Sequence, residues 1–246
     1  MHLRRFLTVT LTFLLGGALV GPCRGDERSV GPSVEIVASV MKAYGGADTL
    51  RKVRSVTATG RIFEFLNGTS GSYSRYLERP GKLRIEVMPE RGGEIRILDG
   101  KQGWQRGSSG FQPVSTLEIQ SMMYQYCYLS LPMGFVDGEY QATYGGTARH
   151  NGREVYLLLI ESKSTPSVRI LIDAKSRLIA RVSANFETGM MGAGELATEY
   201  SDYRVAGGVL FPHKLTNYAG DMKLSEIVLT NIQLNRHLPS SLFAPE

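Results

Sequence analysis

The strongest constraint in this sequence is an alternation of apolar and polar residues that recurs along most of the chain. In Lys82–Val87, for example, Leu83, Ile85 and Val87 alternate with charged residues. Successive side chains of a β-strand point to opposite sides, so a period of two indicates a strand with one buried face. Similar runs occur at Val56–Leu66, Gly71–Glu78, Gly93–Leu98, Gln141–Thr147, Val155–Ser162, Val168–Asp173, Leu178–Phe186, Leu196–Val205, Val209–Tyr218 and Lys223–Leu234.

Compact turn signals separate these runs, among them the segments ERPGK, LDGKQG, RHNGRE and VAGG. Gly, Asn and Asp in such segments favour tight hairpins. About ten strands joined mostly by hairpins predict one large antiparallel sheet, which must curl because strand twist accumulates. The sequence has no repeat of fixed period, low-complexity tract or linker. Residues 26–246 are therefore expected to form a single domain.

Two segments depart from the strand period and predict helices. Ser33–Gly46 carries apolar residues at helical spacing and ends in two glycines. Ser115–Leu131 begins with Ser-Thr-Leu-Glu, the pattern of a capping box in which serine and glutamate satisfy each other's backbone N–H groups. A third break is the glycine-rich segment Thr188–Gly194, which we expect to be a loop.

The run SMMYQYCYLSLPMGF (Ser121–Phe135) is uncharged and rich in Met and Tyr. It is too short to span a membrane, which takes about 20 apolar residues. Methionine adapts to ligands of varied shape, and tyrosine suits the rim of a cavity. A Met stripe on a helix also packs as ordinary core. We predict that this segment is a helix across the mouth of the curved sheet.

The N-terminus has the layout of a secretory signal peptide. Arg4 and Arg5 precede the apolar run Phe6–Val20, and a short polar stretch ends at residue 25. We expect cleavage after residue 25 and export across the inner membrane to the periplasm. Two alternatives stay open: the segment is retained as an anchor, or Cys23 is lipidated, although Pro22 stands where a lipobox has a small residue.

The charge balance gives little support to nucleic-acid binding. The formal net charge is +5, but residues 1–25 contain three arginines and no acid, so 25 basic residues face 23 acidic ones in the remainder. Nucleic-acid binding would need basic residues clustered on one face, and here they alternate with acids along the strands. After residue 25 the sequence has a single cysteine, Cys127, so an apolar core must supply the stability.

The sequence has no recognisable catalytic or metal-binding pattern. His150, His213 and His237 lack metal-ligand spacing, and GxSxG and P-loop motifs are absent. Cys127 has no neighbouring His or Lys that would lower its pKa, which favours a buried, inert thiol. We therefore expect no catalytic residue, no metal and no cofactor. An enzyme with unrecognised machinery is kept as a third alternative to the binding functions below.

Several segments resemble the LolA-type family of periplasmic outer-membrane lipoprotein carriers. RPGKLRIEVMPERGGEIRILDGKQGWQ is similar to the family's early strands, with turns at Arg79-Pro80 and Asp99-Gly100-Lys101 and a strand that carries Trp104. VYLLLIESKSTPSVRILIDAKSRLIARV is similar to paired strands that meet at an aspartate turn. YSDYRVAGGVLFPHKLTNY and NIQLNRHLPSSLFAPE are similar to the last strands and tail of the LolA/LolB-like superfamily.

The resemblance implies a mainly β (α+β) fold. Its sheet would be strongly curved and antiparallel, forming an incomplete β-barrel with an N-terminal helix and a lid helix in the concave mouth. An apolar cavity would hold acyl chains without catalysis. The glycine-rich segments Gly92-Gly93 and Gly189–Gly194 do not map onto the carriers. Superfamily membership is therefore expected, rather than the carriers' own role in every detail.

The function expected from these features is a periplasmic carrier or chaperone that binds lipoprotein acyl chains or another lipid in outer-membrane lipoprotein sorting. Expected partners are the lipid and membrane-bound donor and acceptor proteins, and we expect a monomer. One alternative is that the helices fill the hollow completely. Another is an envelope sensor or protein-interaction module of the same fold that binds a peptide or partner protein without transport.

The residues expected to line the cavity and its lid are Val37, Met41, Ile85, Ile97, Trp104, Ile119, Met122, Met123, Tyr126, Leu157, Leu159, Ile170, Met190 and Met191.

Overall fold

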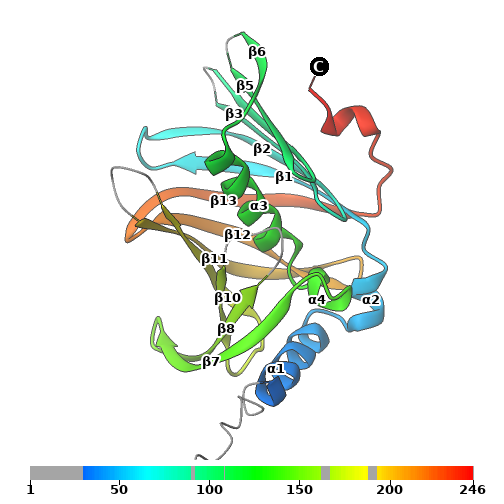
Figure 1. Ribbon diagram of the computed structural model, residues 1–246, viewed down its shortest axis with the longest axis vertical. Coiled ribbons are helices and arrows are strands. Elements are labelled where there is room, and N and C mark those ends of the chain that lie inside the picture. The colour runs from blue at the N-terminus through cyan, green and yellow to red at the C-terminus, as the bar shows by residue number, and fades with distance from the viewer. Residues whose placement is uncertain (1–29, 90–91, 108, 162–166, 188–192, 246) are drawn as a thin grey trace, which may run out of the picture.

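The computed structural model describes residues 30–89, 92–107, 109–161, 167–187 and 193–245. The predicted signal peptide and the two methionines Met190 and Met191 lie outside these ranges. Within them the chain forms one antiparallel sheet of 13 strands, in the order β6-β5-β4-β3-β2-β1-β13-β12-β11-β10-β9-β8-β7. Helices α1 (Val30–Ala43) and α3 (Thr116–Ser130) pack against one side of this sheet (Figure 1).

The helices are α1 (Val30–Ala43), α2 (Ala47–Arg51), α3 (Thr116–Ser130), α4 (Met133–Val136) and the short 3-10 helix η2 (Ser240–Phe243). The strands are β1 (Ser55–Glu64), β2 (Thr69–Glu78), β3 (Lys82–Pro89), β4 (Glu94–Asp99), β5 (Gln102–Gly107), β6 (Gly110–Pro113), β7 (Gln141–His150), β8 (Arg153–Glu161), β9 (Val168–Asp173), β10 (Ile179–Glu187), β11 (Ala193–Ala206), β12 (Val209–Ala219) and β13 (Met222–Leu234).

These bounds confirm the mainly β fold, the predicted strand runs and both predicted helices. Alternation alone did not predict β5 and β6, and only the resemblance implied the strand that carries Trp104. Strand β6 has four residues, too few to show a period of two. None of the helices in the described ranges is both long and apolar enough to cross a membrane.

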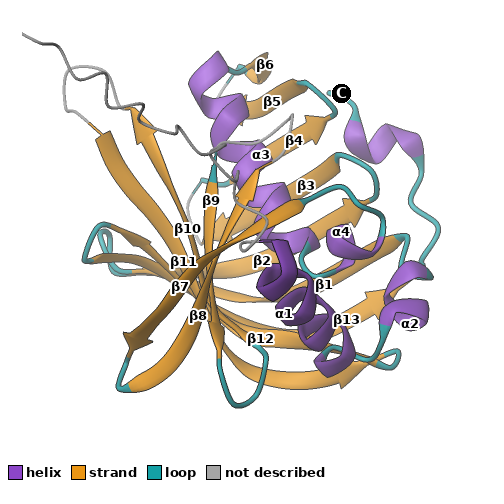
Figure 2. Cartoon of the chain, turned by 60° about the horizontal axis from the view of Figure 1, so that its bottom comes forward, coloured by secondary structure: helices purple, strands orange, loops and turns teal. Residues whose placement is uncertain are grey.

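The sheet is open, and the expectation of strong curvature is not met. Its edge strands β6 and β7 do not pair with each other, so the sheet neither closes nor curls strongly. Helix α1 packs on β7, whereas α3 contacts strands of both halves, β2, β4 and β5 on one side and β10 on the other. Figure 2 shows these helices on one side of the sheet.

The two faces of the sheet bury different clusters. The face under α1, α3 and α4, here called the helix face, carries the main core, which includes Ala58, Leu77, Ile85 and Ile170. On the opposite face, here called the outer face, a smaller core forms where Ile95 and Ile97 of β4 meet the C-terminal tail. The tail residue in this cluster is Phe243 of η2.

Helix α1 is fixed to the sheet through its C-terminal end. The Tyr44 hydroxyl lies 2.8 Å from the Tyr203 hydroxyl and accepts a hydrogen bond from the Ile179 backbone at 3.1 Å. The Leu210 backbone N–H donates to the Tyr44 carbonyl at 3.1 Å. Gly45 follows with a φ of +119°, and a Cβ there would lie 2.2 Å from the Gly208 carbonyl oxygen. Only glycine permits this close approach.

Candidate functional site

Helix α3 forms where the capping box predicted it. The Glu118 backbone N–H donates to Ser115 Oγ at 3.3 Å, and the Ser115 N–H donates to Glu118 Oε2 at 2.8 Å. The Ser115 hydroxyl also donates to Glu118 Oε2 at 2.7 Å, and this bond together with the bond from the Ser115 N–H lowers the pKa of the Glu118 carboxyl. The helix ends at Ser130 because Leu131 takes an extended conformation before Pro132. The run Ser121–Phe135 therefore begins inside α3 and continues through α4.

Tyrosines tie the middle of α3 to the helix face. The Tyr124 hydroxyl lies 3.0 Å from the Val182 carbonyl and 3.2 Å from the Leu196 carbonyl, so it fixes the helix over β10 and β11. The Tyr200 hydroxyl donates to the Tyr128 carbonyl at 2.8 Å. The Met122 and Cys127 side chains are buried in the main core. Much of the helix is therefore packed as core, with cavities along its two sides.

The first cavity, here called the methionine cavity, has a volume of about 620 Å³. Met123 and Tyr126 of α3 form one wall, and Pro80 in the β2–β3 turn and Leu98 near the end of β4 form another. Charged side chains complete the lining: Arg54, Arg79, Lys101, Asp137 and Glu139. A volume in this range is typical of small-molecule sites. An apolar wall with a charged lining suits an amphiphilic ligand.

The buried Arg79 shapes the polar side of this cavity. Its guanidinium donates to the Val53 carbonyl at 2.9 Å and the Met133 carbonyl at 3.0 Å, and it forms an ion pair with Asp137. Burial raises the pKa of the Glu139 carboxyl, although the charge of Arg79 acts in the opposite direction. Burial also raises the pKa of Tyr126 to about 12. Arg79 thus joins the β2–β3 turn to α4 beside the cavity.

The second cavity, here called the polar cavity, lies on the other side of α3 and has a volume of about 190 Å³. Ser121, Tyr124, Gln125 and Tyr128 line it from the helix, with the i, i+3, i+4, i+7 spacing of one helix side. From the sheet it is lined by Arg96, Leu196, Ala197, Thr198, Asn217, Tyr218, Leu224 and Ser225. No carboxylate of the described residues is part of this lining. Arg96 is the charged side chain of this lining, and its Nε lies 3.0 Å from Glu94 Oε1.

The residues that the sequence proposed for a ligand site are only partly brought together. Met123 and Tyr126 line the methionine cavity. Ile85, Met122 and Ile170 are buried in the main core, where Val37, Met41 and Ile119 pack against it. Four others lie on the outer face: Ile97 and Trp104 in the cluster with the tail, and Leu157 and Leu159 half-buried on β8. Met190 and Met191 lie outside the described residues.

Sequence reasoning missed two arginines on the helix face. Arg75 is 2% exposed and follows Tyr73 by two residues on β2. Arg96 faces the same side, because Arg75 pairs with Ile85 of β3 and Ile85 pairs with Arg96 of β4. The signal was present in the alternation, which places Tyr73, Arg75 and Leu77 on one face. An arginine between two buried residues of a strand marks a buried charge.

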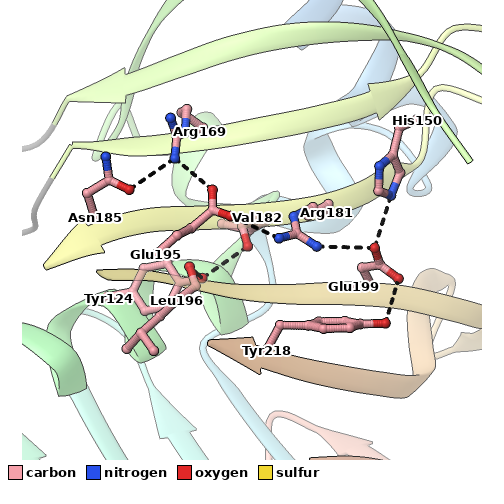
Figure 3. Close-up of polar contacts among 10 residues, drawn as sticks. All are labelled: Tyr124, His150, Arg169, Arg181, Val182, Asn185, Glu195, Leu196, Glu199 and Tyr218. Atoms are coloured by element: carbon pink, nitrogen blue, oxygen red, sulfur yellow. Dashed lines mark hydrogen bonds and ion pairs between the residues drawn. The ribbon is translucent and has the colours of Figure 1, made fainter. Parts of the chain in front are cut away.

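The outer face carries a contrasting network of paired charges, shown in Figure 3. Arg181 contacts Glu195 at 3.0 Å and Glu199 at 3.2 Å, and Arg169 contacts Glu195 at 2.7 Å. His150 Nε2 lies 3.1 Å from Glu199 Oε1. We call these five residues the outer-face network. It borders a hollow of about 430 Å³ in which both signs of charge are present.

The described residues show no arrangement that indicates catalysis. Burial raises the pKa of the Cys127 thiol to about 12, which leaves it a poor nucleophile. No group of three or more His, Cys, Asp or Glu side chains in the described ranges could hold a metal ion. The Ser130 hydroxyl contacts the Tyr140 hydroxyl at 2.6 Å, and the Ser130 Oγ also donates to the Cys127 carbonyl at 3.1 Å. These groups are explained by packing.

No protein-family model matches the chain, and no curated protein matches it. Solved structures match in fold. A domain from Vibrio parahaemolyticus described as an outer membrane lipoprotein-sorting protein domain has a TM-score of 0.54 at 11% identity, over 86% of this chain and 96% of that one. A LolA superfamily protein from Nitrosomonas europaea has a TM-score of 0.52 at 15% identity, over 86% and 97%.

A DUF1329 family protein from Desulfovibrio piger gives a TM-score of 0.56 at 13% identity, over 87% of this chain and 97% of that chain. At such identities the likeness concerns the fold and not the ligand or the partner. The chain therefore has the fold of the LolA superfamily.

Proposed function

We propose that the protein is an envelope carrier that binds an amphiphile, either lipoprotein acyl chains or another lipid, between α3 and the sheet. The observation that carries this proposal is the methionine cavity, whose apolar wall is formed by Pro80, Leu98, Met123 and Tyr126. Burial of acyl groups there would contribute about 25 cal/mol per Å² of apolar surface. The flexible thioether of Met123 can adapt to chains of different shape.

The shared fold and the N-terminal signal layout support the same proposal. The LolA-superfamily fold is compatible with a lipid-binding role, and the sequence at residues 1–25 is typical of an exported protein. In this proposal α3 acts as the lid. Its outward movement would open the methionine cavity, and the tyrosine hydrogen bonds to β10 and β11 would hold it closed.

Titration with a fluorescent acyl probe tests the proposal. The purified protein should bind the probe saturably. Met123→Trp, which fills the methionine cavity, should weaken binding about tenfold or more, the effect of losing about 1.4 kcal/mol of contact. The matched control is Gln120→Trp, because Gln120 is exposed on the same helix. Equal binding by the two variants would contradict the assignment of the cavity.

A second candidate function, docking to a partner protein without transport, is favoured by one observation on the β1–β2 hairpin. Phe63 and Phe65 pack edge to face at 5.1 Å, and with Leu66 they are exposed at the tip. Exposed apolar side chains gathered in this way mark interaction sites. Crosslinking in the native envelope should recover a partner that Phe65→Ser loses. The carrier proposal predicts instead that organic extracts of the protein contain lipid.

A further inference from the structure

Arg75 is a buried cation without a carboxylate partner. Its Nε and Nη1 atoms have no hydrogen-bond partner among the described residues, and these nitrogens carry three of the five N–H donors of a guanidinium. None of the ion pairs of the described residues includes Arg75. A buried charge is normally paired, so an unpaired one requires an explanation.

A second cation lies in the same row of the helix face. Arg96 is separated from Arg75 by one strand, because both pair with Ile85 of β3. Two strand spacings place their Cα atoms about 10 Å apart, which is within the combined reach of two arginine side chains. Arg96 Nε contacts Glu94 at 3.0 Å on its own strand. The charge of Arg96 is therefore partly balanced, and that of Arg75 is not.

Two tyrosines and a glutamine surround these cations. Burial raises the pKa of Tyr73 to about 12, although a hydrogen bond from Arg75 and the charges of Arg75 and Arg96 act to lower it. Burial also raises the pKa of Tyr128, although the charges of the same two arginines act to lower it. Tyr128 and Arg96 both line the polar cavity, and Arg96 lies one strand away from Arg75 on the same face. We call Tyr73, Arg75, Arg96, Gln125 and Tyr128 the Arg75 cluster.

Gln125 adds a further unsatisfied group at the same place, beside Arg75 and beside Arg96, whose Nε makes no hydrogen bond among the described residues. The Gln125 Oε1 atom is buried without a partner among the described residues, while its Nε2 donates to the Tyr128 hydroxyl at 3.2 Å. A rotation of the amide by half a turn would exchange the two atoms. The Tyr128 hydroxyl could then donate to Oε1, and Nε2 would be free to donate to a ligand. The cluster thus offers donors that only an acceptor-rich ligand would satisfy.

The polar cavity and the methionine cavity lie on the two sides of α3, and β4 contributes a residue to each. Arg96 lines the first and Leu98 lines the second, and both residues face α3. Residues two apart on a strand are separated by about 7 Å. A single amphiphile could therefore lie under α3, with its chain beside Met123 and its head beside Tyr128.

We propose that the Arg75 cluster binds a phosphate or carboxylate group, and that this group is the acidic head of the amphiphile held in the methionine cavity. Guanidinium groups suit both anions, because their hydrogen bonds to them are charge-assisted. The identity of the lipid rests on the proposed function, whereas the anion site does not. A free phosphate ion offers the same chemistry as a phosphate head group, so the test separates the two sources.

The test compares three probes by equilibrium titration: oleoyl lysophosphatidic acid, monooleoylglycerol and inorganic phosphate. The two lipids share the acyl chain and differ in the phosphate. The unmodified protein should bind the acidic lipid about tenfold or more tightly than the neutral one, as a charge-assisted contact of this kind predicts. Arg75→Met should remove that preference and leave the affinity for monooleoylglycerol unchanged. Arg61→Met is the matched control, because Arg61 is an exposed arginine on the neighbouring strand.

Each outcome has one meaning. Equal affinity for both lipids with no phosphate binding overturns the anion site and leaves the proposed function intact. Phosphate binding that depends on Arg75, without any lipid binding, supports the anion site and overturns the amphiphile. Phosphate binding together with equal lipid affinities overturns the assignment of the head group. If Arg75→Met does not fold, Arg75→Lys keeps the charge but loses the planar fork, and it should reduce the preference without abolishing it.

Discussion

The arginines on the two faces of the sheet differ in their partners. On the outer face, Arg181 contacts two carboxylates and Arg169 contacts one, so the charges are balanced within the protein (Figure 3). On the helix face, Arg75 is more deeply buried and has no carboxylate partner among the described residues. The paired arginines are explained by the fold itself. The unpaired one is explained by a ligand, because sites that break a structural rule are expected where function requires it.

Among single substitutions, one in the outer-face network is expected to change the stability of the protein most. Arg181→Met removes the cation between Glu195 and Glu199 and leaves two carboxylates without their shared partner. We expect the free energy of unfolding to fall by about 2 kcal/mol, measured by urea denaturation at pH 7. Arg204→Met is the control, because Arg204 belongs to an exposed pair and its loss should not move the transition.

On the helix face, the removal of an arginine is not expected to lower the free energy of unfolding. Arg75→Met replaces an unpaired buried cation by an apolar side chain of similar length. The free energy of unfolding should stay the same or rise by about 1 kcal/mol in the same urea experiment. A clear loss of stability would show that Arg75 is neutralised within the folded protein, and the contrast between the two faces would then disappear.

The pH dependence of stability should also differ between the two faces. Partial burial acts to raise the pKa of Glu195, but hydrogen bonds from Ser183 and Arg181 and nearby cations lower it overall. Its contribution is therefore present above the unfolded pKa, near 4.3, and lost as pH falls through the folded value. The pKa of Glu139 is raised by burial, so its contribution is present at low pH and lost as pH rises.

Two substitutions test the expected directions in which stability changes with pH. Glu195→Gln should flatten the decline in urea midpoint between pH 5 and pH 3. Glu139→Gln should raise the midpoint at pH 7 and leave it unchanged at pH 3, where the carboxyl is already protonated. If both variants changed the midpoint with the same pH profile, the electrostatic distinction between the faces would be wrong.

The smallest effect concerns Cys127, which reports whether α3 stays closed. The thiol is buried and its pKa is raised to about 12, so labelling at pH 8 should occur only as fast as the protein opens. Ser72→Cys, made in a Cys127→Ser background, places a thiol at an exposed position of β2 and should react at once. Immediate labelling of Cys127 in the folded protein would mean that α3 does not hold this side chain against the sheet.

The sequence predicted the elements better than their surroundings. Alternation in Lys82–Val87 and the capping box at Ser115 are local signals, and local hydrogen bonding decides both. The outward position of Ile97 and Trp104 could not be predicted, because both faces of β4 are buried and a tail more than 100 residues away covers one of them. The burial of Arg75 could not be predicted for the same reason, since a strand pattern assigns a residue to a face without showing what covers that face.

The binding of an acidic amphiphile by Arg75 and the methionine cavity is tested most directly by a structure of the protein with bound oleoyl lysophosphatidic acid. We expect the acyl chain beside Met123 and Tyr126 and the phosphate within hydrogen-bonding distance of Arg75. A lipid bound at the β1–β2 hairpin, or a phosphate directed away from β2 into solvent, would contradict this expectation.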